Sequence, residues 1–174
     1  MGESGLAPER VVLRLDSESR LKAAAAEIAC RWLDSGAEPL LVGLQGDLGS
    51  GKTTWVRGML EGLGYRGLVP SPTYTLIEIY ALERVTLVHV DLYRLGTSNE
   101  PAGSEELESL GLRDWLAKSA TWLLVEWPER APQLASGCDL TITLETGRAE
   151  QRTLRAEARS ARGEAALNGL AGCS

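Results

Sequence analysis

The hydrophobic positions of the chain follow two periodicities that alternate along the sequence. Short apolar runs, the pattern of buried strands, are separated by stretches in which apolar residues recur every three or four positions, the pattern of helices. Strands are predicted at residues 11–15, 40–44, 85–90, 121–125 and 140–144, with a β-rich stretch at 73–80. Helices are predicted at residues 17–33, 53–63 and 105–116. This alternation indicates an α/β fold with a largely parallel central sheet.

The C-terminal region has no single pattern. Arginines recur there at steps of three and four, which would align them on one face of a helix. Residues 153–156 would fit a strand equally well. Interspersed glutamates favour a solvated charged face, with a basic lid or an RNA-facing edge as the alternative. We expect one domain over residues 1–174, with flexible ends at 1–9 and 160–174.

A phosphate-binding sequence follows the predicted strand at 40–44. Residues 46–53 read GDLGSGKT, the G-x-x-x-x-G-K-T pattern of a P-loop. In this pattern backbone N–H groups surround the phosphate oxygens, Lys52 reaches the β- and γ-phosphates, and the Thr53 hydroxyl holds Mg²⁺. The next helix points its positive end at the phosphates. A glycine-rich surface turn is the alternative. The predicted nucleotide contacts of this segment are Asp47, Leu48, Gly49, Ser50, Gly51, Lys52, Thr53 and Thr54.

Two of the predicted strands end in acidic residues, Asp91 and Glu126. In an open α/β sheet, ligands bind at the carboxyl ends of the strands. A P-loop site also needs a carboxylate for Mg²⁺ or its water ligands. We therefore expect both acids to reach the phosphate site, where one binds Mg²⁺ and the other binds a metal water or orients the attacking water. A helix cap or an ordinary surface acid is the alternative for each.

Three further features lie close to these positions. His89, the single histidine, lies on the same side of its strand as Asp91, and we favour a packed strand residue over a general base. Trp127 follows Glu126 and would either stack near the nucleotide or cap the sheet. Ser71 and Thr73 flank Pro72, and their hydroxyls would contact phosphate or Mg²⁺ unless this is only a proline-rich turn.

Composition and charge indicate the cellular compartment and exclude some classes of binding partner. The chain has 174 residues and a net charge of −6, which argues against a broad basic surface for DNA or RNA but not against a local patch. Its three cysteines are widely spaced and match neither a zinc site nor a disulfide framework, which favours a reducing cytoplasm. No apolar run approaches membrane-spanning length, and no signal-peptide pattern is present. We expect a cytoplasmic protein that binds neither membranes nor DNA.

Four sequence blocks together resemble the TsaE (YjeE) family, bacterial P-loop ATPases of the tRNA threonylcarbamoyladenosine (t6A) pathway. The resemblance spans residues 10–160 and departs from the family at Ser50, where alanine is usual, at Val90, where phenylalanine is common, and in the longer stretch at 96–104. The matching blocks are residues 46–54 (GDLGSGKTT), 71–76 (SPTYTL), 89–95 (HVDLYRL) and 126–130 (EWPER).

The resemblance implies a P-loop NTPase fold, with a mostly parallel central sheet flanked by helices, and binding of ATP and Mg²⁺. By position, Thr53 and Glu126 bind Mg²⁺, and Asp91 is a catalytic or metal-water carboxylate. Residues 71–75 form a switch-like loop, Trp127 flanks the nucleotide, and the start of the first helix brings Ser17 near it. The implied partners are TsaD and TsaB, which transfer threonylcarbamoyl to a tRNA adenosine, so that tRNA is reached through the complex.

The function that we expect is slow, Mg²⁺-dependent ATP hydrolysis in support of that transfer, with Lys52, Asp91 and Glu126 as catalytic residues. Turnover is expected to be slow because neither a positioned water nor an arginine finger can be assigned. A P-loop small-molecule kinase is one alternative, and an ATP-gated binding module without essential hydrolysis is another. A GTPase is less favoured, because no Asn-Lys-x-Asp sequence occurs.

Overall fold

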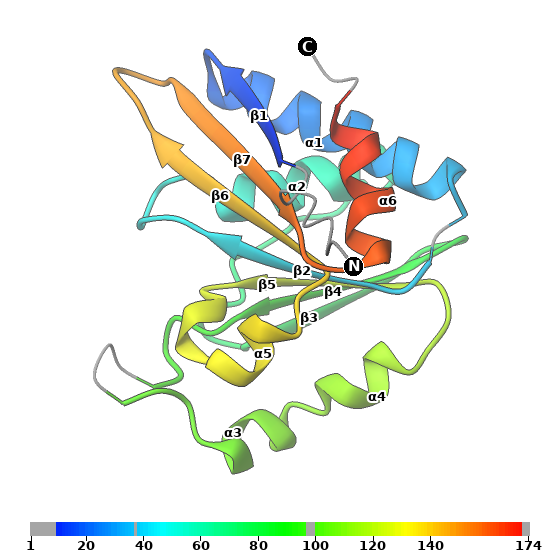
Figure 1. Ribbon diagram of the computed structural model, residues 1–174, viewed down its shortest axis with the longest axis vertical. Helices are drawn as coiled ribbons and strands as arrows, with labels where there is room; N and C mark the ends of the chain where they lie inside the picture. The colour runs from blue at the N-terminus through cyan, green and yellow to red at the C-terminus, as the bar shows by residue number, and fades with distance from the viewer. Residues whose placement is uncertain (1–9, 37, 97–99, 172–174) are drawn as a thin grey trace, which may run out of the picture.

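A single mixed sheet with helices on both faces forms the framework of the molecule (Figure 1). The computed structural model describes residues 10–36, 38–96 and 100–171, and the expected flexible segment 1–9 lies outside them. Seven strands in this part of the chain pair in the order β1-β7-β6-β2-β5-β4-β3. They are β1 (Arg10–Leu15), β2 (Leu40–Gln45), β3 (Ile77–Ala81), β4 (Thr86–Asp91), β5 (Thr121–Glu126), β6 (Leu140–Thr146) and β7 (Arg152–Ala158).

The centre of the sheet is parallel and its edges are antiparallel. Strand β2 pairs in parallel with β5 and β6, and β5 pairs in parallel with β4. At the edges, β3 is antiparallel to β4, and β7 is antiparallel to both β6 and β1. The α/β P-loop architecture is confirmed, and the parallel centre places the carboxyl ends of β2, β4 and β5 at one edge.

Helices cover the two faces of the sheet in two groups (Figure 1). Helices α1 (Glu18–Asp34), α2 (Lys52–Gly62) and α6 (Ala161–Leu170) pack on one face. The opposite face carries α3 (Ser104–Ser109), α4 (Leu112–Leu116), α5 (Pro132–Ser136) and the 3₁₀ turn η1 (Pro128–Arg130). Both faces of the central strands are therefore buried, which explains their continuous apolar runs. In the described residues, no helix is long and apolar enough to cross a membrane.

Helix α1 begins after Ser17, whose hydroxyl caps it by accepting a hydrogen bond from the backbone N–H of Arg20 at 3.3 Å. Helices α1 and α2 pack closely because small residues face each other. A Cβ atom at Gly58 on α2 would meet the backbone of Lys22 and the Cβ atom of Ala25. This contact holds α2, and with it the end of the P-loop, against α1.

The middle of the chain differs from the sequence prediction in two places. The helix predicted at 105–116 is two short helices, because Gly111 adopts a left-handed conformation (φ 62°) that ends one helix before the next begins. The β-rich stretch at 73–80 becomes a strand only at Ile77. Before it, the backbone N–H of Leu76 donates to the carbonyl of Pro72 at 2.6 Å and closes a turn.

Residues 152–170 form a strand and a helix. The strand interpretation of residues 153–156 is confirmed by β7, and the single helical face of arginines is wrong. Within the segment expected to be flexible, α6 begins after Ser160, whose hydroxyl accepts from the N–H of Gly163 at 3.1 Å. Its side chains Ala166, Leu167 and Leu170 are buried, which fixes the helix to the sheet.

Candidate functional site

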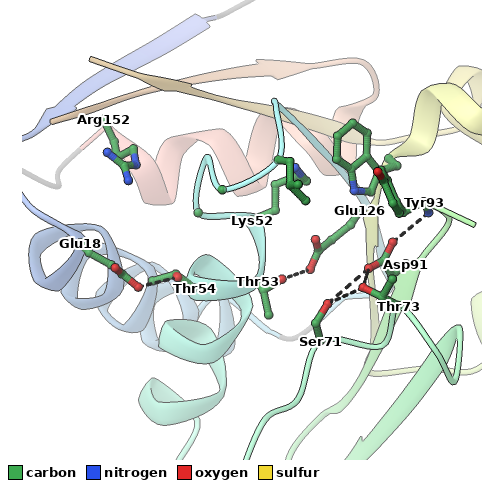
Figure 2. Close-up of a pocket in the computed structure, with 14 residues that line it drawn as sticks. Glu18, Lys52, Thr53, Thr54, Ser71, Thr73, Asp91, Tyr93, Glu126 and Arg152 are labelled. Carbon is green, nitrogen blue, oxygen red and sulfur yellow. Dashed lines mark hydrogen bonds between the residues drawn. The ribbon is translucent and has the colours of Figure 1, made fainter. Parts of the chain in front are cut away.

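A pocket of about 340 Å³ lies between the P-loop and the carboxyl ends of β4 and β5 (Figure 2). The side chains that line it come from segments far apart in the sequence, from Glu18 near the start to Arg152 near the end. The residues that line it are Glu18, Leu48, Gly49, Gly51, Lys52, Thr53, Thr54, Ser71, Thr73, Asp91, Tyr93, Glu126, Trp127 and Arg152.

The P-loop connects β2 to the start of α2. Gly51 is the residue before the helix, and no side chain in the described part of the chain caps its first turn. The first backbone N–H groups of an α-helix have no intrahelical partners, and in α2 the residues that carry them line the pocket. Together with the positive end of the helix dipole, they form a site suited to phosphate.

The Lys52 ammonium is buried in the wall of the pocket, against the P-loop backbone. It donates to the carbonyl oxygens of Gly46 at 2.6 Å and Asp47 at 2.9 Å. It also lies 4.0 Å from the ring centroid of Trp127, within the range of a cation–π contact. Burial lowers the pKa of Lys52, and nearby carboxylates, Glu126 foremost, act in the opposite direction. The ammonium is thus desolvated and surrounded by oxygen acceptors.

Thr53 and Glu126 meet across the loop and the sheet. The Thr53 hydroxyl donates to Oε1 of Glu126 at 2.8 Å (Figure 2). Glu126 is only 3% exposed, so this carboxylate is held within the pocket wall. The strand register brings Asp91 directly opposite Glu126 on the neighbouring strand. The two strand-end acids predicted from the sequence therefore lie side by side.

Asp91 anchors the loop that carries Ser71 and Thr73. Its Oδ2 accepts from the Thr73 hydroxyl at 2.7 Å and from Ser71 at 3.4 Å, and its Oδ1 accepts from the backbone N–H of Tyr93 at 2.8 Å. The two hydroxyls are 2.8 Å apart. A shift of Asp91 would therefore be transmitted directly to this loop, which is the behaviour expected of a switch-like segment.

Aromatic rings form one wall of the pocket. The centroids of Tyr93 and Trp127 are 5.1 Å apart with an interplanar angle of 50°. Trp127 has a left-handed backbone (φ 60°), which is uncommon for an aromatic residue. The backbone N–H of Trp127 donates to the carbonyl oxygen of Leu44, near the end of β2, at 3.2 Å. This anchoring sets the indole beside Lys52.

The opposite end of the pocket is built by α1 and β7. Oε1 of Glu18, the first residue of α1, accepts from the Thr54 hydroxyl at 2.9 Å. Arg152, the first residue of β7, lies on the far side of the P-loop from Asp91 and Tyr93 (Figure 2). This end combines one carboxylate and one guanidinium.

The structure brings most of the predicted site residues into one pocket, but three of them do not line it. The side chain of Ser17 caps α1, and its neighbour Glu18 lines the pocket instead. Asp47 accepts a hydrogen bond from Lys52 through its backbone carbonyl. Ser50 is buried. Three lining residues were not among the predicted contacts. Tyr93 stands within a block that resembles the family, Arg152 belongs to the arginine series, and Glu18 carries no sequence signal of its own. The unpredicted lining residues are Glu18, Tyr93 and Arg152.

The side chains around Thr53 suit a hard cation. The Thr53 hydroxyl and the carboxylates of Glu126 and Asp91 are oxygen donors, which Mg²⁺ prefers. The described residues contain no cluster of three or more His, Cys, Asp or Glu side chains that would enclose a metal ion by themselves. The oxygen donors named above fit Mg²⁺, which proteins usually hold through one or two carboxylates together with substrate phosphates.

Comparison with known proteins gives one consistent result. The model of the family described as "Threonylcarbamoyl adenosine biosynthesis protein TsaE" matches residues 15–154. Proteins named tRNA threonylcarbamoyladenosine biosynthesis protein TsaE are 42% identical in Haemophilus influenzae over 106 residues and 40% identical in Bacillus subtilis over 94 residues. These matches cover 61% and 52% of this chain, and 63% and 54% of the relatives, so each spans less than two thirds of the relative's length.

A solved structure extends the likeness over nearly the whole chain. The crystal structure of Bacillus subtilis YdiB superposes with a TM-score of 0.73 at 26% sequence identity. The match covers 95% of this chain and 97% of that one.

Proposed function

This chain belongs to the TsaE family, and from that premise we propose that it binds ATP with Mg²⁺ in the P-loop pocket and hydrolyses it slowly in support of t6A formation on tRNA. The observation that carries the proposal is the convergence of Lys52, Thr53, Asp91 and Glu126 on one pocket. The P-loop provides a phosphate site, and the strand-end acids provide the carboxylates that such a site needs.

Different residues of the pocket have different roles in this proposal. The N-terminus of α2 and the Lys52 ammonium bind the phosphates, which carry the negative charge that this end of a helix favours. Thr53 and Glu126 are the residues that would hold Mg²⁺, with Asp91 beside them. Mg²⁺ supplies charge neutralisation at the β- and γ-phosphates when it is bound. The role proposed for Asp91 is that of a carboxylate that binds a metal water or orients the attacking water, and through Thr73 it links the phosphate site to the loop at 71–75.

Slow turnover is part of the proposal. An arginine that stabilises the transition state raises phosphoryl-transfer rates by about 10³–10⁵. Arg152 lies at the end of the pocket away from Asp91, and no residue of the chain is assigned that role (Figure 2). We therefore propose that TsaD and TsaB bind this chain, complete or position its catalytic groups, and carry out the transfer to tRNA. The cytoplasmic setting and the absence of DNA and membrane partners stay predictions.

The test compares the P-loop lysine with a lysine of the same chain outside the pocket. Lys118 lies 3.6 Å over the ring of Trp115 and does not line the pocket. Lys52→Ala should weaken Mg²⁺–ATP binding by about 10–100-fold, since hydrogen bonds to charged groups contribute roughly 1.5–3 kcal/mol. Lys118→Ala should leave binding unchanged. Calorimetry or a fluorescent ATP analogue gives the affinities.

The products distinguish an ATPase from a kinase. Radiolabelled γ-phosphate should appear as inorganic phosphate, at a rate that rises when TsaD and TsaB are added. Label transferred to a small acceptor would favour a kinase. Full ATP binding and hydrolysis in Lys52→Ala would overturn the assignment of the pocket.

A further inference from the structure

His89 is a buried side chain that contacts Glu126, one of the residues proposed to hold Mg²⁺. It lies on β4, has no exposed surface, and is the single histidine of the chain. Its Nε2 atom lies 2.7 Å from Oε1 of Glu126 on the adjacent strand β5. Its other ring nitrogen, Nδ1, is buried and has no hydrogen-bond partner among the described residues. Within the described part of the chain, the polar contact of the ring is therefore with the carboxylate of Glu126.

The contact determines which ring nitrogen carries hydrogen. A carboxylate oxygen only accepts, so Nε2 must be the donor. A hydrogen on Nδ1 would be a buried donor without an acceptor, which costs free energy. The geometry therefore selects the tautomer with hydrogen on Nε2 and none on Nδ1.

The same carboxylate oxygen is held from two directions. Oε1 of Glu126 accepts from His89 on one strand and from the Thr53 hydroxyl on α2 at 2.8 Å. Neither bond uses Oε2. A carboxylate fixed by two donors on one oxygen loses the freedom to rotate, so the direction of its second oxygen is set by the protein. Such supporting bonds around a metal ligand typically change metal affinity by about 10–100-fold when they are removed.

We propose that His89 is a positioning residue that orients Glu126 for Mg²⁺ bound with ATP. The inference rests on the proposed function, because it assigns Glu126 to the metal. His89 is not a catalytic residue: it is fully buried, does not line the pocket, and reaches the site only through Glu126.

The experiment uses three substitutions that differ in where they place a donor. Glutamine carries its amide nitrogen at the ε position and can replace Nε2. Asparagine carries it one bond closer to the backbone, and leucine has none. The measurement is ATP affinity over a series of Mg²⁺ concentrations and again in EDTA. In His89→Leu and His89→Asn, the Mg²⁺ concentration for half-maximal ATP binding should rise by about 10–100-fold, with ATP affinity in EDTA unchanged. His89→Gln should stay near the wild type.

A second measurement needs no substitution. Since the chain has one histidine, the ring ¹⁵N signals of the untagged protein belong to His89 without ambiguity. The long-range ¹H–¹⁵N spectrum should show hydrogen on Nε2 and a bare Nδ1. Hydrogen on Nδ1 alone would overturn the proposal.

The other outcomes separate this inference from the function beneath it. An unchanged Mg²⁺ requirement in a folded His89→Leu protein would overturn the role of His89 and leave the ATPase proposal intact. An equal loss of affinity in Mg²⁺ and in EDTA, or the same loss in His89→Gln as in His89→Leu, would indicate a merely structural residue. A wild-type protein with no Mg²⁺-dependent ATP binding would overturn both proposals.

Discussion

Cys138 shows how burial controls a single ionisable group. Its side chain packs beneath the sheet, and its thiol lies 3.6 Å from the carbonyl oxygen of Leu134. Burial raises the pKa of Cys138 to about 11 from an ordinary value of 9.0. The unfolded chain therefore loses this proton at lower pH than the native protein does. The stability linked to the thiol is complete below pH 9 and is lost as the pH rises through about 11.

Replacing this thiol should change the alkaline pH dependence of folding. Cys138→Ala should remove a decline of roughly 2–3 kcal/mol in the free energy of unfolding across that range, since each pKa unit corresponds to about 1.4 kcal/mol. Urea unfolding of both proteins at pH 8 to 11 measures it. Cys30→Ala is the control, because this thiol is exposed. Equal pH slopes for wild type and Cys138→Ala would contradict the assignment.

The sequence predicts some side chains of the site and not others for a physical reason. Lys52 and Thr53 follow from the spacing of the P-loop, and Asp91 and Glu126 from their places at strand ends. The bond from His89 to Glu126 does not follow, because it depends on the register between β4 and β5. Alternation places His89 on the side of Asp91 but does not identify its partner.

At the level of the element, β7 carries arginines with different roles on its two faces. Arg152 lies on the same side as the buried Leu154 and Ala156 and lines the pocket. Arg155 lies on the other side, where its Nε is 3.2 Å from Oε1 of Glu145. The sequence did not separate them, because steps of three and four fit a helix, and only pairing with β6 and β1 makes the segment a strand.

The two arginines make a matched pair of substitutions. Arg152→Ala should weaken ATP binding by about 10–100-fold, if its guanidinium contributes one bond to a charged group. Arg155→Ala removes the same charge from the same strand and should leave ATP affinity unchanged. Binding of a fluorescent ATP analogue at fixed ionic strength measures both. An equal loss of affinity in both variants would show that Arg152 acts only through the overall charge, and wild-type affinity in both would contradict a contact between Arg152 and ATP.

At the level of the whole molecule, nucleotide binding should stabilise the fold. The pocket joins residues of α1, α2, β4, β5 and β7, so a ligand that binds there holds both ends of the chain to its centre. A ligand at 100 times its dissociation constant stabilises the native state by about 2.7 kcal/mol. For a chain of this size, that corresponds to a rise of about 5–10 °C in the melting temperature.

Thermal unfolding followed by circular dichroism, with and without Mg²⁺–ATP, measures this rise. Because its affinity should be about 10–100-fold weaker, Lys52→Ala should show about half of this rise or less at the same ATP concentration, and Lys118→Ala should show all of it. A rise of equal size in Lys52→Ala would place the stabilising nucleotide elsewhere on the molecule.

The centre of the architecture is predictable from the sequence, and its edges are less so. Continuous apolar runs identify β2, β4 and β5, since a strand buried on both faces has no polar side. Strands β3 and β7, which pair antiparallel toward the two edges of the sheet, have mixed patterns that fit more than one structure. Their pairing is set by neighbours rather than by their own residues. The break at Gly111 was missed because a glycine within a helical pattern is often tolerated.

The pairing of β1 with β7 has a consequence for how the protein is made. Arg10 on β1 and Glu157 on β7 are paired in the sheet and joined by a side-chain hydrogen bond, although they are 147 positions apart in the sequence. During synthesis, β1 therefore emerges from the ribosome long before β7 exists. At about 5–20 residues per second, that interval is on the order of ten seconds. Meanwhile the P-loop, β4 and β5 have already been synthesised. The end of the pocket that contains Arg152 is therefore the last to form. A nascent chain has its phosphate-binding P-loop before it has β7, the strand that completes the pocket.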